Sequence, residues 1–387
     1  MDRIIPDRAR IESQIVREHA TNSPSDPARK RVIMHIGWEK TGTSAIQNFC
    51  GRNAKWLAQH GIHYPLVNDT PQHVFIHTEL ATRNPQRVRT LIQRVRTIID
   101  ESPCQTIVFS HETLHLDDPA AIREMLDGCD TSILAYVRNP VDAVISHFAT
   151  LIRYGSLPSH NLPKAVRFYR KNLLACFDYY WALENFAACF GRDNLTVRHY
   201  HPDALIGNQS VTDFLHHIGL AEAEGSSWPQ TRANPSIDAD MLRIVARITR
   251  ATPGLKPPER KQLARDLYDK LIKKLGAEPS RPVQRFVSQT LRQKLYNHYE
   301  PNLQPLYDRY FDGQAIFQPP ASTTRIIDDA QLAYERTHEI ARVIDKAKLV
   351  PPRIVKHVIS RDPFATRPST MASPKIAEPV TTAGSPS

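Results

Sequence analysis

One short stretch of the sequence combines glycines, hydroxyl groups and a lysine in a way that suits anion binding. Residues 37–44 read Gly-Trp-Glu-Lys-Thr-Gly-Thr-Ser, with two glycines, one lysine and three hydroxyl side chains. An apolar, β-branched run at 32–36 precedes them, and apolar residues at helical spacing follow from Ala45. Amides in such a loop and at a helix N-terminus direct positive partial charge at an anion. The stretch therefore predicts a phosphate-binding loop between a strand and a helix.

The same loop departs from the P-loop of nucleoside triphosphatases. Gly37 and Gly42 have the G-x-x-x-x-G spacing. A P-loop continues with lysine and then serine or threonine, whereas Thr43-Ser44 follows here and the lysine, Lys40, lies inside the loop. The usual pairing of lysine with a magnesium-binding hydroxyl is therefore not specified. An ordinary glycine-containing turn between a strand and a helix is the alternative interpretation.

A second anion-binding pattern lies at residues 136–148. An apolar run at 132–137 ends at Arg138, and Ser146 follows eight residues later in a segment with helical spacing. Eight helical residues are about two turns, so Ser146 returns to the side of the helix start. An arginine fork and a hydroxyl can then hold one phosphate. Alternatively, Arg138 forms a salt bridge at the sheet and Ser146 is an incidental helix residue.

A sheet of parallel strands must position these residues. Strands alternate with helices along residues 31–220, which predicts an α/β fold with a central parallel sheet flanked by helices and, beyond it, a helical C-terminal part. Ligands bind at the carboxyl ends of such strands, and Lys40, His111 and Arg138 each lie just past one. We interpret His35, inside the first strand, as a core residue. The expected strands are 32–36, 62–64, 106–110, 132–137 and 195–200, and the expected helices are 45–60, 73–83, 86–101, 119–126, 141–154, 162–190, 211–218, 236–250, 258–275, 282–299 and 326–348.

Together these segments resemble the superfamily of sulfotransferases that use 3′-phosphoadenosine 5′-phosphosulfate (PAPS), in particular bacterial carbohydrate-type members. The resemblance covers residues 31–318 and includes Leu-Thr-Val-Arg-His-Tyr at 195–200, Leu-Ile-Gly at 205–207 and residues 214–220. It implies a P-loop-like nucleotide-binding (sulfotransferase) fold and a PAPS-dependent transferase. It also implies two donor contacts: the 5′-phosphosulfate with Lys40, Thr41, Gly42, Thr43 and Ser44, and the 3′-phosphate with Arg138 and Ser146.

The sequence departs from the family pattern at two places. Trp38-Glu39 precedes Lys40, where many members have proline before the lysine. The glycine- and lysine-rich third nucleotide segment of cytosolic members is absent, and Thr-Arg-Ala-Asn-Pro-Ser at 231–236 is similar to a segment of bacterial members. The resemblance implies Arg232 as a further donor contact.

The resemblance also implies a mechanism, which is in-line transfer of a sulfuryl group to an acceptor hydroxyl or amine. Lys40 would neutralise charge on the bridging oxygen and the leaving phosphate, and a base must take the acceptor's proton. Cytosolic members carry a histidine just after the strand that precedes the Arg…Ser strand, and His111 occupies that position here. Other branches use a glutamate, which keeps Glu112 as a candidate. His73 or His77 is the third candidate.

Composition and charge bound the class of protein. The chain has 387 residues, 41% of them hydrophobic, which is enough for a large core, and no apolar run is long enough to cross a membrane. Five cysteines without a C-x-x-C pair predict reduced thiols and no metal site. Because no apolar signal segment is visible, we expect a cytoplasmic protein. The net charge of +10 favours an anionic ligand and leaves peripheral contact with a membrane open.

The expected partners are a small-molecule nucleotide donor and an acceptor, which by resemblance is a glycan or glycolipid. We expect no nucleic-acid partner, since no nucleic-acid motif or basic stretch with interleaved aromatic residues occurs. The oligomeric state is left open. Two alternative functions are kept: a P-loop-like kinase or nucleotide phosphotransferase, and a non-catalytic protein that binds a nucleotide or nucleic acid. Thr43 at the P-loop lysine position counts against the kinase.

The chain divides into four expected regions. Residues 1–30 are polar and broken by prolines, which predicts a flexible N-terminal arm. Residues 31–320 form the expected sulfotransferase domain, and 321–350 a C-terminal helix. Residues 351–387 are rich in Pro, Ser, Thr and Ala, which predicts a disordered tail.

Overall fold

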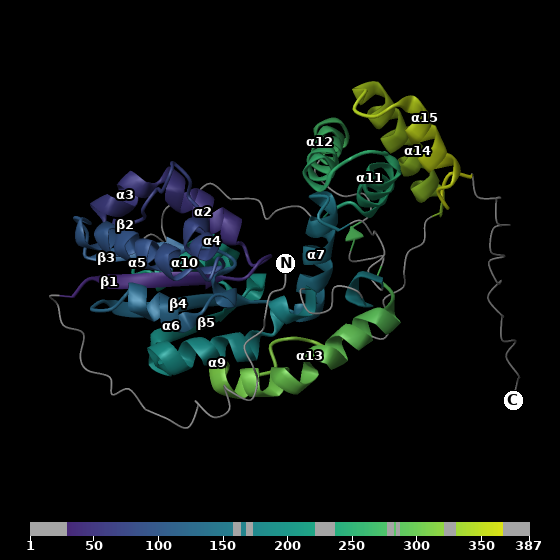
Figure 1. Cartoon of the computed structure of the whole chain (residues 1–387). Coiled ribbons are helices and arrows are strands. Elements are labelled where there is room, and N and C mark those ends of the chain that lie inside the picture. The colour runs from purple at the N-terminus through teal and green to yellow at the C-terminus, as the bar shows by residue number, and fades with distance from the viewer. Residues whose placement is uncertain are drawn as a thin grey trace, which may run out of the picture.

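A five-stranded parallel sheet in the order β2-β3-β1-β4-β5 forms the centre of the protein (Figure 1). The computed structural model describes residues 29–157, 164–167, 173–220, 237–276, 282–283, 287–320 and 330–366. The first strand of the chain pairs with β3 on one side and with β4 on the other. The strands are β1 (Arg31–Gly37), β2 (Ile62–His63), β3 (Thr106–Ser110), β4 (Asp130–Val137) and β5 (Leu195–His199). The predicted α/β class and the predicted strand positions are confirmed.

Helices cover both faces of the sheet, which explains why the central strands are apolar on both sides. On β1, Val32, Met34 and Ile36 contribute to one core, and Ile33 contributes to the other. The alternation follows from the strand repeat of two. The helices over the first face are α4 (Val74–Leu80), α5 (Pro85–Asp100), α6 (Pro119–Met125) and α9 (Tyr179–Phe190), and those over the second are α2 (Thr43–Arg52), α3 (Ala54–Gln59) and α10 (Ser210–His217).

A helical part continues from the carboxyl end of β4 (Figure 1). α7 (Pro140–Arg153) packs against α11, α12 and α13, and buried residues of these helices belong to the same core as the first face of the sheet. Among the described helices, none is long and apolar enough to cross a membrane. The helices of this part are α11 (Ala239–Ala251), α12 (Pro257–Leu275), α13 (Gln289–Tyr310), α14 (Ala330–Ala347) and α15 (Pro352–Ser360).

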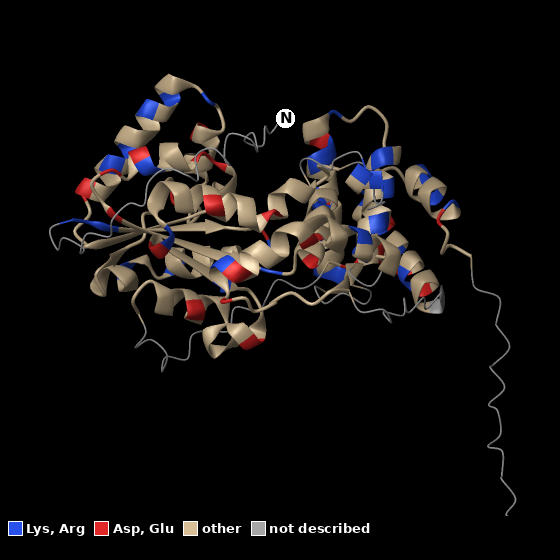
Figure 2. Cartoon of the chain, turned by 90° about the horizontal axis from the view of Figure 1, so that it is seen from below, with Lys and Arg blue, Asp and Glu red and all other residues tan. Residues whose placement is uncertain are grey.

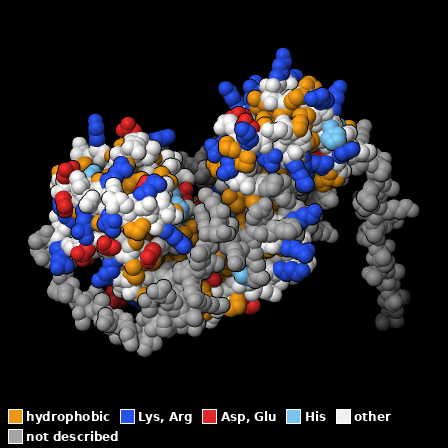
Figure 3. All heavy atoms as spheres, viewed as in Figure 1, with side chains coloured by type: hydrophobic (Ala, Val, Ile, Leu, Met, Phe, Trp, Pro, Cys, Tyr) orange, Lys and Arg blue, Asp and Glu red, His pale blue; other side chains and the backbone are white. Residues whose placement is uncertain are grey.

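Most of the excess positive charge belongs to the helical part rather than to the sheet (Figures 2 and 3). Residues 237–276 and 330–366 carry 17 lysines and arginines against nine aspartates and glutamates, a net +8 of the +10 of the whole chain. Most of the net positive charge therefore lies on the surface of these helices. It does not by itself indicate an anion-binding site at the sheet.

Two expected helices are interrupted. The helix expected from Ala45 to Gly61 is two helices, because Asn53 between them has φ −111° and ψ 21° and its side-chain amide donates to the Phe49 carbonyl (2.8 Å). The helix expected at 162–190 is also not continuous. A 3₁₀ turn, Ala175–Phe177, precedes α9, and residues 158–163 and 168–172 lie outside the described residues.

By contrast, α13 continues past residue 299, where the expected helix ended. It runs from Gln289 to Tyr310 across Pro301 and Pro305, although each proline removes an amide donor. Tyr299 and Leu303 are buried, and the Tyr299 hydroxyl donates to the Leu174 carbonyl (2.8 Å). Packing of this face maintains the helix across the prolines.

The prediction of a disordered segment at 351–387 is wrong at its start. Helix α15 buries Ile354, Val355 and Val358 against α11 and α14. The spacing of these side chains is that of one helix face, which the overall composition of the segment conceals. The helix expected at 321–350 corresponds to α14, which packs against α11 and α12. Residues 1–28 and 367–387 lie outside the described residues.

A buried ion pair attaches the end of this segment to α11. The Asp362 side chain is fully buried and accepts hydrogen bonds from Arg243 and from Arg247 (3.1 Å). Asp362→Asn should lower the free energy of unfolding by up to about 3 kcal/mol, the lower end of the cost of removing one partner of a buried ion pair. Urea unfolding measures the change. Asp345→Asn, at an exposed position of α14, should change stability by less than about 0.5 kcal/mol. Equal effects of the two substitutions would contradict the docking of this segment.

Candidate functional site

The Lys40 loop is packed tightly against the elements around it. Gly37 has φ +75°, and a Cβ there would lie 2.3 Å from the Glu112 Cα. Gly42 has φ +78°, and a Cβ there would lie 2.7 Å from the Ser210 Oγ. Both positions therefore require glycine. Lys40 has φ +72°, a conformation that residues other than glycine rarely adopt and that is frequent at functional sites.

The hydroxyl groups of the loop have two different environments. Thr41 and Thr43 are buried, and both hydroxyls donate to the Trp38 carbonyl (2.6 and 3.1 Å), so they brace the turn from inside. Ser44 is exposed in the first turn of α2. Gly42 is the N-cap of α2 and no side chain caps this helix, so an anion can take that place.

Lys40 and Arg138, predicted from separate segments, come together at the carboxyl edge of the sheet. The Arg138 Nη1 donates to the Lys40 carbonyl (3.0 Å) across 98 residues of sequence. Burial lowers the pKa of the Lys40 ammonium, and the charges of Arg153 and Arg138 lower it further, whereas Glu39 and Glu112 act in the opposite direction. A desolvated ammonium near two guanidinium groups favours an anionic ligand.

Ser146 lies on α7, half-buried, and its carbonyl accepts from the Thr150 hydroxyl (3.1 Å). Within the described ranges no hydrogen bond joins it to Arg138, and the prediction that both hold one phosphate stays a prediction. Arg153 was not among the predicted residues, although it lies seven positions after Ser146, on the same face of α7 by helical periodicity. It also forms an ion pair with Asp269 (3.3 Å).

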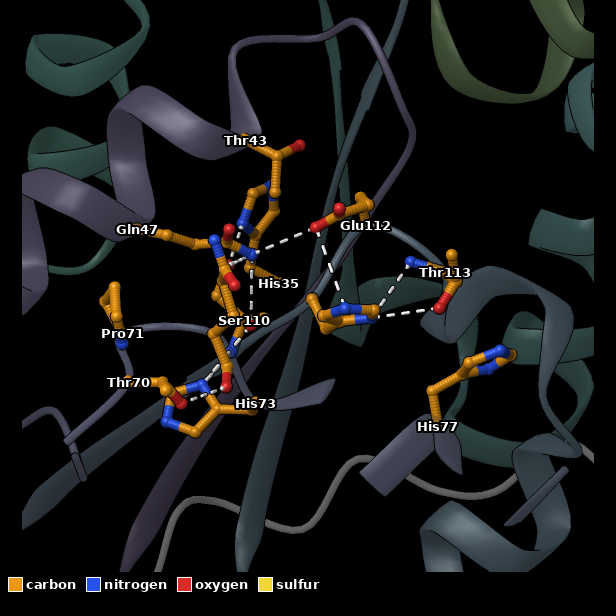
Figure 4. Close-up of polar contacts among 12 residues, drawn as sticks. His35, Thr43, Gln47, Thr70, Pro71, His73, His77, Ser110, Glu112 and Thr113 are labelled. Carbon is orange, nitrogen blue, oxygen red and sulfur yellow. Dashed lines mark hydrogen bonds and ion pairs between the residues drawn. The ribbon is translucent and has the colours of Figure 1, made fainter. Parts of the chain in front are cut away.

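His111 and Glu112 follow β3 directly and adjoin the loop. The His111 Nδ1 lies 2.9 Å from the Thr113 hydroxyl, and its Nε2 lies 3.8 Å from the Glu112 Oε2. The same carboxylate oxygen accepts from the Gln47 side-chain amide (3.4 Å; Figure 4). Burial lowers the pKa of His111, although the Glu112 charge raises it, so the ring is neutral near pH 7. A neutral imidazole beside a carboxylate can accept a proton.

His77 lies next to this pair (Figure 4). Its ring stacks nearly parallel on that of His111, with ring centroids 6.0 Å apart. Its Nδ1 donates to the Asp117 carboxylate (2.9 Å), which fixes the orientation of the ring. His77 is partly exposed and keeps its place as an alternative base.

His73 has a structural environment instead. The ring is fully buried, Nδ1 accepts from the Ser110 amide (2.9 Å; Figure 4), and Nε2 donates to the Pro65 carbonyl (2.8 Å). Burial lowers its pKa to about 4, although both backbone contacts act in the opposite direction. Because both ring nitrogens are bonded to the backbone, His73 fastens the segment after β2 to β3 and is poorly suited to act as a base.

His35, interpreted from the sequence as a core residue, is also fully buried. Its Nδ1 lies 2.8 Å from the Ser110 hydroxyl, and its ring packs against Tyr136 and Phe214. Burial lowers its pKa to about 3, which keeps the ring neutral.

Gln47 was not among the predicted site residues. It is fully buried in α2, and its amide donates to the Ser110 carbonyl (3.2 Å) as well as to Glu112. The available signal was a polar residue between Ile46 and Cys50 on the apolar face of a predicted helix. Arg232 lies outside the described residues.

Comparisons with known proteins add a fold-level observation. No protein-family model matches the sequence, and no curated protein matches it either. A crystal structure of a sulfotransferase from Alicyclobacillus acidocaldarius is 16% identical, and the match covers 73% of this chain and 95% of that one with a TM-score of 0.42. A likeness of this size carries no argument about function, so the proposal below rests on the site.

The environment of His73 predicts a loss of stability in acid. Its pKa is 6.5 in an unfolded chain and about 4 in the folded one. Between these values the unfolded chain binds more protons, so stability falls as the pH falls through this window. Urea unfolding at pH 7 and pH 5 should show a loss of about 2 kcal/mol from His73 alone.

Two variants isolate this contribution. His73→Gln keeps a donor and an acceptor but does not titrate, so it should be about 2 kcal/mol less sensitive to the same pH change. His60→Gln replaces an exposed histidine and should keep the wild-type dependence. The assignment fails if His73→Gln and wild type have the same pH dependence.

Proposed function

We propose that this protein is a sulfotransferase that moves the sulfuryl group of PAPS to a hydroxyl or amine of an acceptor. One observation carries the proposal: the guanidinium that follows β4 binds the backbone of the lysine loop that follows β1. Two anion-binding segments thus meet at the carboxyl edge of a parallel sheet, where ligands of such sheets bind. A donor with two separate phosphate groups matches two such segments.

The residues at this edge fit a PAPS-like donor. The uncapped N-terminus of α2 and the amides of the Lys40 loop suit the 5′-phosphosulfate. Arg138, with Ser146 on the following helix, suits the 3′-phosphate. The lowered pKa of Lys40 reflects a desolvated cation near other cations, an environment that an anionic donor would relieve. Arg232 stays a proposed donor contact by resemblance.

The proposed reaction forms one bond to sulfur and breaks another. The acceptor oxygen or nitrogen attacks sulfur, the bond between sulfur and the 5′-phosphate oxygen breaks, and the electron pair leaves on that oxygen. Lys40 would neutralise the charge that develops there, and the loop amides would hold the equatorial sulfate oxygens. The acceptor's proton would pass to His111 Nε2.

The contacts of His111 support this role. The Thr113 hydroxyl lies 2.9 Å from Nδ1, and the Thr113 amide donates to the same nitrogen (3.4 Å). The proposed role requires the tautomer in which Nδ1–H donates to the hydroxyl instead, which leaves the lone pair on Nε2, on the side of Glu112. Burial keeps the ring neutral near pH 7, and the nearby carboxylate would stabilise the imidazolium that forms. Glu112 is the alternative base, held by Gln47.

We propose a glycan or glycolipid as acceptor, by resemblance, and a cytoplasmic location. All five cysteines are described and none forms a disulfide, which is compatible with a reducing compartment.

The alternative functions, a kinase and a non-catalytic binding protein, predict different nucleotide binding from the sulfotransferase. These differences can be measured without knowing the acceptor.

Binding of adenosine 3′,5′-bisphosphate tests the donor site. The bisphosphate should bind without magnesium and more tightly than ATP or duplex DNA, as calorimetry can measure. Arg138→Ala should weaken this binding roughly 10- to 100-fold, since a charge-assisted phosphate contact contributes about 1.5–3 kcal/mol. It should weaken binding of 5′-AMP much less, so the preference for the 3′-phosphate should collapse.

Arg96→Ala is the matched control, because Arg96 also donates to a backbone carbonyl, that of Glu124 in α6 (2.9 Å), and no contact joins it to the Lys40 loop among the described residues. Its binding of both nucleotides should equal that of wild type. An Arg138→Ala protein that still prefers the bisphosphate over 5′-AMP would disprove the two-site arrangement. Magnesium-dependent preference for ATP would favour the kinase.

Turnover with labelled PAPS and the best acceptor from a glycan and glycolipid screen tests the base. His111→Ala should lower kcat by about 10²–10⁴, the usual contribution of general acid–base catalysis, with little change in bisphosphate affinity. Glu112→Gln should have a smaller effect if the carboxylate only stabilises the imidazolium. A large loss in Glu112→Gln with near-normal His111→Ala moves the role to Glu112. A loss confined to His77→Ala moves it to His77.

A further inference from the structure

Three side chains with metal-binding atoms meet beside the Lys40 loop. They are Glu39 in the loop, His147 in α7 and Cys176 in the 3₁₀ turn Ala175–Phe177. One ligand atom from each lies within 4.8 Å of the others. The Glu39 Oε2 is 3.3 Å from the His147 Nδ1. No metal-ligand spacing predicted this group, because its members lie far apart in the sequence.

The surroundings hold these side chains in place. His147 and Cys176 are buried, with 8% and 3% of their surface exposed. The Trp38 indole donates to the Cys176 carbonyl (2.7 Å), and the Phe177 ring packs edge-on against His147. The Glu39 Oε2 is buried but accepts no hydrogen bond of good geometry from the described residues. A buried carboxylate oxygen in that state is unfavourable unless a cation is close to it. The Lys40 charge acts on Glu39, but no ion pair joins the two side chains among the described residues.

We propose that Glu39, His147 and Cys176 bind a zinc ion. A thiolate, an imidazole and a carboxylate are the ligand types that zinc takes, and the soft sulfur disfavours magnesium or calcium. One thiolate and one carboxylate neutralise the two charges of the ion, which limits the penalty of burying it. Three protein ligands leave one position for water or another oxygen.

The spacing of the ligand atoms is compatible with this ion. Zinc bonds of 2.0–2.3 Å in a tetrahedron place ligand atoms about 3.6 Å apart. The Glu39 and His147 atoms are 3.3 Å apart, and all the ligand atoms of the group lie within 4.8 Å of one another, so they are about 1 Å or less from tetrahedral spacing.

The site would connect three segments that form the surroundings of Lys40. Glu39 precedes Lys40, and His147 follows Ser146 in α7, so a bound ion would fasten the loop to that helix. The role is structural, and it does not depend on the sulfotransferase proposal. An ion pair between Glu39 and protonated His147, without a metal, is the competing arrangement.

Cobalt titration of tag-free, full-length protein dialysed against chelator tests the site. We expect one Co²⁺ per chain, a thiolate-to-cobalt charge-transfer band, and displacement of Co²⁺ by Zn²⁺. Cys176→Ser should abolish the band, and Glu39→Gln and His147→Gln should weaken cobalt binding at least about 10-fold. Cys189→Ser, which removes a half-buried thiol of α9, is the matched control and should titrate like wild type.

Thermal unfolding provides a second readout. Zn²⁺ should raise the Tm of wild type and of Cys189→Ser but not that of Cys176→Ser, because a ligand that binds only the folded state stabilises it. Absence of the charge-transfer band in folded wild-type protein, or its persistence in Cys176→Ser, would overturn the proposal. Bisphosphate binding, measured separately, reports on the donor site, so failure of one proposal is distinguishable from failure of the other.

Discussion

The candidate site depends on one steric constraint: the backbone of the Lys40 loop packs directly against the backbone of the residues that follow β3. A side-chain carbon at Gly37 would lie 2.3 Å from the Glu112 Cα, so no other residue fits there. Arg138 approaches the loop from β4, on the other side of β1, and bonds to the Lys40 carbonyl. Three strand ends therefore share one small region, and the side chains proposed to bind and react belong to residues in that contact.

The histidines in this region differ in the hydrogen-bond partners of their ring nitrogens. His73 bonds to two backbone groups, and proton uptake would break a contact that joins β3 to the preceding segment. His111 has the Thr113 hydroxyl and amide beside Nδ1 and a carboxylate near Nε2, and the hydroxyl and the carboxylate tolerate a change of protonation. Burial lowers the pKa of both rings, so burial alone does not separate a structural histidine from a reactive one. The chemistry of the partner does.

The sequence was sufficient for the sheet and for the residues at its ends, because apolar strands followed by Lys40, His111 and Arg138 form a local pattern. It was insufficient where partners lie far apart. The contact of Gln47 with Glu112 spans 65 residues, and that of Trp38 with Cys176 spans 138. Such pairings are set by how helices pack on the sheet, which no local spacing reports. Helix α15 was missed for a different reason: its apolar face was readable, but the composition of the longer segment outweighed it.

The position of β1 in the sheet has a consequence for synthesis of the chain. It is made first, yet it is the central strand, and its partners β3 and β4 begin at Thr106 and Asp130, 75 and 99 residues after Arg31. At about 5–20 residues per second, β1 waits roughly 5–20 s for its second partner. During that time an apolar, β-branched segment has no sheet to join. Such segments readily aggregate with other exposed apolar segments. Translation rate and chaperone capacity should therefore govern how much of this protein reaches the folded state.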